Sequence, residues 1–159
     1  MTTTKQQAPK FRVMDVFERA VRSHGPKPAL RVRRGGAWRT YTWSDYHQQV
    51  RQVARAIIAV GARPGSGTCI VGYNSPEWFF ADIGSIFAGL VPAGIYTTNS
   101  PEQCEYVAAH CDASVVFVED QSQLDKFIAV RSKLPALKAI VLMQGETNAR
   151  GVTTWARFL

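Results

Sequence analysis

Residues 74–102 read NSPEWFFADIGSIFAGLVPAGIYTTNSPE, so the tetrapeptide at 74–77 returns unchanged at 99–102. The block between the two copies is apolar and carries one charged side chain, Asp82. In each copy, serine suits the helix N-cap, proline suits the first helical position, and glutamate suits the positive end of the helix dipole. The stretch therefore predicts two buried strands that each run into a helix, which is typical of an open α/β sheet.

The same alternation continues on both sides of this stretch. The runs VVFV at 115–118 and AIVLM at 139–143 indicate strands buried on both faces, as in parallel sheets. We predict an α/β fold with a partial doubly wound, mainly parallel sheet and helices on both faces, preceded by a short helix and a peripheral hairpin. The expected strands are 28–33, 38–43, 68–73, 91–96, 114–119 and 138–143. The expected helices are 13–23, the segment between Thr42 and Gly61, 76–89, 101–111 and 121–134, and TTWARFL at 153–159 is expected to begin another.

The charge is unevenly distributed along the 159 residues, which carry a net +7. Residues 1–63 hold 13 Lys and Arg against 3 Asp and Glu, whereas residues 64–159 hold 6 against 9. A basic surface of this kind suits anionic lipid, a nucleotide or nucleic acid. A solvated face that only keeps the protein soluble also explains it, and we prefer that explanation. Because the chain has no RNA-binding aromatic motif and no zinc-finger spacing, we expect no nucleic-acid partner.

The N-terminus is polar, and the longest apolar run, 83–96, is too short to span a bilayer. We therefore expect a cytoplasmic protein, with peripheral contact to intracellular membranes through the basic N-terminal half left open.

The three cysteines, Cys69, Cys104 and Cys111, are odd in number, so a disulfide framework is not expected and buried thiols are preferred. The histidines stand alone, and no metal site is predicted.

Two polar clusters follow the predicted strands at the edge where open parallel sheets bind ligands. Tyr73 and Asn74 form the first, and Tyr96, Thr97 and Thr98 form the second. Capping and turn formation explain the asparagines, and β propensity suits the second cluster, so pocket lining is an interpretation beside these alternatives. The sequence has no P-loop and no nucleophile elbow, so no catalytic residue is predicted. Glu119-Asp120 is expected to close a strand and cap the next helix.

The run from 73 to 120, and GIYTTNSPE within it above all, resembles the N-terminal region of the adenylate-forming, AMP-binding superfamily. The resemblance extends over about residues 13–157 and is strongest to long-chain fatty acyl-CoA synthetases of the bubblegum type. It implies a two-step ligase in which a long-chain fatty acid and ATP give an acyl-adenylate, and coenzyme A then gives the acyl-CoA. It also implies Mg²⁺ as a companion of ATP.

The family's Ser/Thr/Gly-rich phosphate loop ending in Pro-Lys-Gly does not occur in this sequence. We therefore expect residues 13–159 to form the N-terminal portion of an AMP-binding domain, truncated before that loop and preceded by disordered residues 1–12. Such a fragment is expected to be inactive alone and to bind no cofactor tightly. Two alternatives stay open: a module that docks on a full-length ligase or an anionic membrane, and an unrelated doubly wound nucleotide-binding domain.

Overall fold

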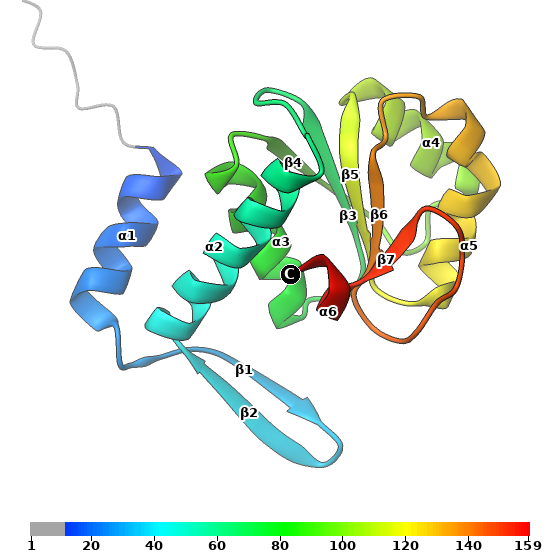
Figure 1. Ribbon diagram of the computed structural model, residues 1–159. Coiled ribbons are helices and arrows are strands. Elements are labelled where there is room, and N and C mark those ends of the chain that lie inside the picture. Colours follow the sequence, from blue (N-terminus) through cyan, green and yellow to red (C-terminus); the bar gives the residue numbers. More distant parts are fainter. Residues whose placement is uncertain (1–11) are drawn as a thin grey trace, which may run out of the picture.

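The protein was analysed as a computed structural model that describes residues 12–159. A five-stranded sheet forms its centre, with the strand order β4-β3-β5-β6-β7 and every neighbouring pair parallel (Figure 1). The strands are β3 (Gly67–Val71), β4 (Val91–Ile95), β5 (Ala113–Val118), β6 (Ala139–Leu142) and β7 (Val152–Thr154). The parallel α/β prediction is thereby confirmed.

Helices cover both faces of this sheet, as Figure 1 shows. The helices are α1 (Val13–His24), α2 (Trp43–Ala59), α3 (Pro76–Phe87), α4 (Pro101–His110), α5 (Gln121–Val130), a 3₁₀ turn (Arg131–Lys133) and α6 (Trp155–Phe158). Alternate residues of each central strand enter opposite cores: Ile70 and Phe117 face α2 and α3, whereas Val71 and Val116 face α4 and α5. Burial on both faces explains the continuous apolar runs.

The two NSPE copies begin helices as predicted. The Ser75 hydroxyl accepts the Trp78 N–H at 3.3 Å at the start of α3, and the Ser100 hydroxyl accepts the Gln103 N–H at 3.3 Å at the start of α4. Proline occupies the first turn of both helices. The repeated tetrapeptide is thus local turn chemistry at two strand-to-helix junctions.

Helices α2 and α3 pack against each other at very short range because α3 carries a glycine at the contact. A Cβ built on Gly84 would lie 2.6 Å from Cγ1 of Val53. Real side chains do not approach that closely. Helix α3 can therefore lie this close to α2 only because Gly84 has no side chain.

A separate two-stranded hairpin lies outside the main sheet (Figure 1). It consists of β1 (Pro28–Arg34) and β2 (Ala37–Thr42), joined by Gly35 and Gly36, both with positive φ angles of 55° and 82°. Tyr41 anchors the hairpin, because its ring packs edge-on against Phe80 of α3 with centroids 5.3 Å apart. The predicted peripheral hairpin is confirmed.

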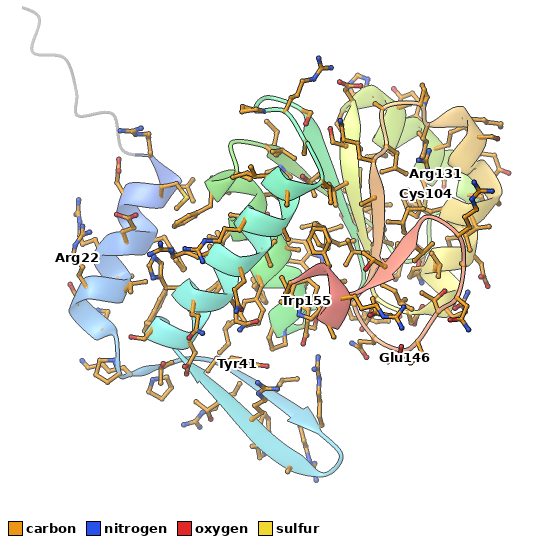
Figure 2. The ribbon with its side chains drawn as sticks, in the orientation of Figure 1. Arg22, Tyr41, Cys104, Arg131, Glu146 and Trp155 are labelled. Atoms are coloured by element: carbon orange, nitrogen blue, oxygen red, sulfur yellow. The ribbon has the colours of Figure 1, made fainter. Side chains whose placement is uncertain are left out.

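The C-terminal segment differs from the sequence prediction. Thr153 and Thr154 do not begin a helix but lie in β7, paired with β6, and the helix begins at Trp155. Phe158 of α6 then packs against Phe117 with ring centroids 5.6 Å apart, and Trp155 (Figure 2) lies edge-on to the same ring with centroids 6.0 Å apart. The short strand was missed because three residues carry almost no alternation.

At the other end, the disorder predicted for 1–12 falls almost wholly on residues outside the described part. Arg12, the first described residue, is the N-cap of α1. Among residues 12–159, none of the helices combines the length and the apolarity that crossing a bilayer requires.

Candidate functional site

The carboxyl edge of the main sheet carries the predicted site residues. Strand β3 lies between β4, which follows it in the chain, and β5, so the strand order reverses at β3. Open parallel sheets bind ligands at the carboxyl ends of strands beside such a reversal. Tyr73 and Asn74 follow β3, and the second polar cluster follows β4.

A surface groove of about 450 Å³ lies between these two strand ends. Its lining residues are Gly72, Tyr73, Asn74, Trp78, Gly94, Ile95, Tyr96 and Thr97. Four of the five predicted residues thus line one groove. The fifth, Thr98, is exposed and is not among the lining residues.

The two tyrosines form the rim of the groove, whereas small residues shape its wall. Tyr73 is 73% exposed and Tyr96 is 82% exposed, so neither ring is packed into the core. A Cβ on Gly94 would lie 3.5 Å from the Trp78 ring, which shows that the indole lies directly over the β4 backbone. Two exposed phenols beside a wall of tryptophan and glycine thus form an uncharged surface.

The turn after β4 is held by a side chain of α5. The Lys126 ammonium of α5 donates to the Thr97 carbonyl at 2.6 Å and to the Gln123 side-chain oxygen at 2.9 Å. The Asn99 N–H donates to the Tyr96 carbonyl at 3.1 Å, which closes the turn. The second polar cluster is therefore presented on a fixed backbone.

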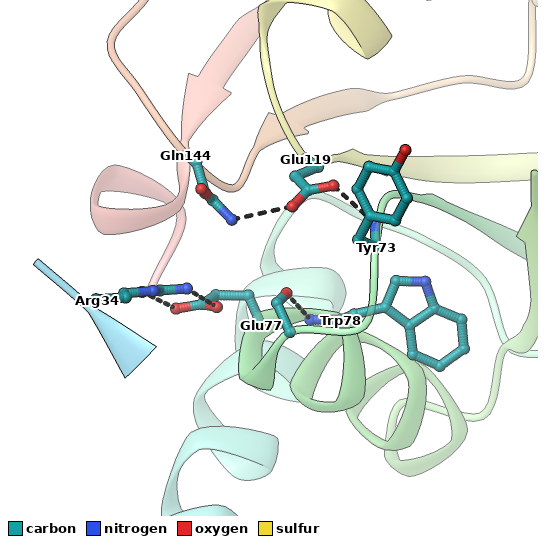
Figure 3. A network of polar contacts seen from close by, with 7 residues as sticks. Arg34, Tyr73, Glu77, Trp78, Glu119 and Gln144 are labelled. Carbon is teal, nitrogen blue, oxygen red and sulfur yellow. Dashed lines mark hydrogen bonds and ion pairs between the residues drawn. The ribbon is translucent and has the colours of Figure 1, made fainter. Parts of the chain in front are cut away.

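The sequence predicted that Glu119 closes a strand, which it does by following β5, but it did not predict the contacts of its side chain. Its carboxylate accepts the Tyr73 N–H at 2.6 Å and the Gln144 side-chain amide at 3.2 Å (Figure 3). Gly72 permits this approach, because a Cβ there would lie 2.7 Å from the Glu119 Cβ. One carboxylate thus links the ends of β3 and β5 to the residues after β6. Its neighbour Asp120 caps α5 as predicted.

An ion pair joins the hairpin to the same edge. The Arg34 guanidinium donates to both carboxylate oxygens of Glu77, at 2.9 and 2.5 Å (Figure 3). The Glu77 side chain is 8% exposed, and its hydrogen bond is the main cause of a raised pKa of Arg34. The sequence shows a glutamate in the first turn of an apolar helix, which is a signal for a buried ion pair. It does not show the partner, because Arg34 lies 43 residues earlier in the chain.

The side chains that line the groove suit an uncharged group of a bound molecule. None of the residues that line the groove is cationic, so the groove has no side chain to offset a polyphosphate. Within residues 12–159, no group of three His, Cys, Asp or Glu side chains could hold a metal ion. The lining of this groove therefore does not fit a magnesium–phosphate group.

Comparison with known proteins gives the family. The family model described as AMP-binding enzyme matches residues 17–157. The chain belongs to the AMP-binding enzyme family. Among curated AMP-binding relatives, it is 39% identical to the long-chain-fatty-acid–CoA ligase ACSBG2 of Xenopus laevis over 153 residues, which cover 95% of this chain and 21% of the relative. It is 39% identical to human ACSBG1 over 132 residues, which cover 83% of this chain and 18% of the relative.

Solved structures of AMP-binding enzymes agree with this assignment. The anthranilate CoA ligase AuaEII, in complex with anthranoyl-AMP, matches with a TM-score of 0.76 and 28% identity, over 84% of this chain and 25% of that one. The acetoacetyl-CoA synthetase of Streptomyces lividans shares the fold with a TM-score of 0.76 at 21% identity, over 91% and 24%. The chain thus spans about a fifth of the length of the curated relatives it matches.

Proposed function

We propose that this chain is the N-terminal segment of a long-chain fatty acid–CoA ligase. The observation that carries the proposal is the 39% identity to ACSBG2 over 153 residues. The reaction is ATP-dependent: ATP supplies the AMP group that turns the carboxylate into an activated acyl-adenylate, and the thiol of coenzyme A then displaces AMP. Membership in the AMP-binding enzyme family disfavours the alternative of an unrelated nucleotide-binding domain.

The proposed role of this segment is to supply part of the α/β frame and the uncharged groove at its edge. Tyr73, Asn74, Tyr96 and Thr97 would contact an uncharged part of a bound molecule there. Since none of the residues that line this groove is cationic, we assign phosphate and Mg²⁺ binding to other parts of the ligase. We derive no catalytic step from this segment.

The segment alone is proposed to be inactive. With ATP, palmitate and radiolabelled pyrophosphate, the isolated chain should give no exchange above the blank, while full-length Xenopus ACSBG2 serves as the positive control. Palmitate-dependent exchange by the chain alone would contradict inactivity. It would leave the ligase assignment standing.

A second role rests on the basic N-terminal half. Arg51 and Arg55 are exposed on α2 beside His47, where they line a shallow surface hollow. We propose that this face contacts anionic membrane surfaces. Sedimentation with phosphatidylserine vesicles at 0.05 M salt, lost at 0.5 M, supports it, because exposed charges are screened by salt. Equal sedimentation with phosphatidylcholine vesicles would contradict it.

A further inference from the structure

Two cysteine sulfurs meet near the amino end of β3, away from the groove at the carboxyl ends of the strands. The Sγ atoms of Cys69 and Cys111 lie 3.6 Å apart, although 42 residues separate them in the chain. Cys69 belongs to β3 and is fully buried, whereas Cys111 is the C-cap of α4 and is half-buried. Cys111 therefore keeps part of its surface exposed to solution, whereas Cys69 is shielded from it.

The backbone around the pair is built for this approach. A Cβ on Gly67, the first residue of β3, would clash with the Cys111 carbonyl oxygen and lie 2.7 Å from its sulfur. The Gly67 N–H donates to the Asp112 carbonyl at 3.2 Å, and Asp112 adopts a positive φ of 50°. The end of α4 is thus fixed against the start of β3, with Cys111 facing Cys69.

The two thiols have different acidities. A hydrogen bond between the two thiols, in which either sulfur can be the donor, lowers the pKa of Cys111 to about 7, while the same bond and burial raise the pKa of Cys69. The C-terminal position on α4 opposes thiolate formation at Cys111, so the contact with the Cys69 thiol is the one that favours it. Thiolates are the form of cysteine that reacts with oxidants, and reactive cysteines are partly exposed.

We propose that Cys111 and Cys69 form a reversible oxidation site for small hydroperoxides. The Cys111 thiolate attacks one oxygen of hydrogen peroxide, the O–O bond breaks, and the product is a sulfenic acid with one water after protonation of the leaving hydroxide. The Cys69 sulfur then attacks the Cys111 sulfur, and the leaving hydroxide takes the Cys69 proton to give a second water. Two thiols lose two electrons to the peroxide, and a disulfide results.

Little movement is required for the second step. The sulfurs need to close from 3.6 Å to a disulfide bond length of about 2.05 Å. The bond would join α4 to β3 and close a loop of 42 residues, which restricts the unfolded chain. A small-molecule dithiol reverses the reaction. Intracellular disulfides of this transient kind are typically redox-sensing.

Peptide mapping of the full chain tests the proposal directly. The reduced protein is treated with hydrogen peroxide, alkylated in denaturant and cleaved after glutamate, which places Cys69 in 19–77, Cys104 in 103–105 and Cys111 in 106–119. We expect peptides 19–77 and 106–119 linked with the loss of two hydrogens, peptide 103–105 alkylated, and the link removed by dithiothreitol. Cys111 found unlinked, linked to Cys104 or linked between two chains would overturn the proposal.

Two variants sharpen the result. Cys104→Ser, a matched change at a buried thiol of α4, should leave the link unchanged. Cys69→Ala should abolish it, and Cys111 should oxidise more slowly, to sulfenic and then sulfinic acid, because the hydrogen bond that favours its thiolate is lost. Oxidised wild type should melt about 5 °C or more above its reduced form, and Cys69→Ala should show no such rise. Identical oxidation products in wild type and Cys69→Ala would also overturn the proposal.

Discussion

The Glu119 carboxylate accepts the backbone N–H of Tyr73 at 2.6 Å and so joins the carboxyl ends of β5 and β3. This contact lies where the strand order reverses, beside the groove between β3 and β4. Gln144 extends the network toward β6 through its N–H, which donates to the Glu119 carbonyl at 2.8 Å. The edge that carries the candidate site is therefore braced across three strands.

Removing this carboxylate should loosen that edge. Glu119→Ala is expected to lower the free energy of unfolding by about 1 kcal/mol, because a hydrogen bond to a charged acceptor contributes more than a neutral one, although this bond is exposed to solvent. Urea denaturation measures the change. Glu146→Ala, at an exposed glutamate of the following loop, should stay within about 0.5 kcal/mol. Equal effects of both variants would contradict a bracing role for Glu119.

The ion pair between Arg34 and Glu77 should be energetically coupled. A double-mutant cycle with alanine at both positions is expected to give about 1–2 kcal/mol, because the Glu77 side chain is 8% exposed and loses its partner in a desolvated position. The Lys133–Glu105 pair, with side chains 60% and 26% exposed, is the matched control and should give a smaller coupling. A smaller coupling in the Arg34 cycle than in the control would contradict this ranking.

Gly84 tests the packing of α2 on α3. Alanine would favour the helix by about 1 kcal/mol through propensity, but its Cβ would lie 2.6 Å from Val53 Cγ1 and overpack the contact. We expect a net loss of about 1–2 kcal/mol in urea denaturation. Gly94→Ala, whose Cβ would have ordinary contact with Trp78 at 3.5 Å, should be nearly neutral. A stabilised Gly84→Ala variant would show that the helices separate easily.

Asp82 should make stability fall as pH rises. Burial raises the pKa of Asp82, so the native state holds this proton more tightly than the unfolded state, where the pKa is about 3.9. The native state therefore binds more protons between the two pKa values, and stability decreases through that window. Asp82→Asn should be more stable than wild type at pH 7 and lose this advantage near pH 3.

Denaturation of both proteins at the two pH values measures the effect. Asp125→Asn, at an exposed position of α5, provides the control and should show no comparable change between the two pH values. A constant advantage of Asp82→Asn at both pH values would mean that titration of this carboxyl is not the cause.

The local features of the fold were predictable from sequence, whereas the contacts between distant segments were not. Ser75 and Ser100 act on residues three positions ahead, so their capping roles follow from spacing alone. The Glu119–Tyr73 contact spans 46 residues and depends on which strand neighbours β3. The Cys69–Cys111 contact likewise requires the strand order and the glycine at 67. Residue types alone do not give such pairings.

The candidate site was predictable only in position. Tyr73 and Tyr96 were placed at strand ends by the alternation of apolar runs and turns, and both border one groove. Trp78 was missed as a lining residue because it lies in the first turn of α3, within the apolar block that reads as core. The glycine at 94 lets the indole reach the groove, and nothing in the local sequence marks that approach.

The central claim is that this chain is a segment of a long-chain fatty acid–CoA ligase. The substrate preference of a chimera that carries this segment tests the claim most directly. Residues 17–157 would replace the matching region of Xenopus ACSBG2, and kcat/KM would be measured with palmitate and with anthranilate. We predict palmitoyl-CoA formation within about tenfold of the parent and a preserved preference for palmitate, since tenfold corresponds to 1.4 kcal/mol at the transition state. A folded chimera that activates anthranilate or acetate but not palmitate would contradict the assignment to a long-chain fatty acid–CoA ligase.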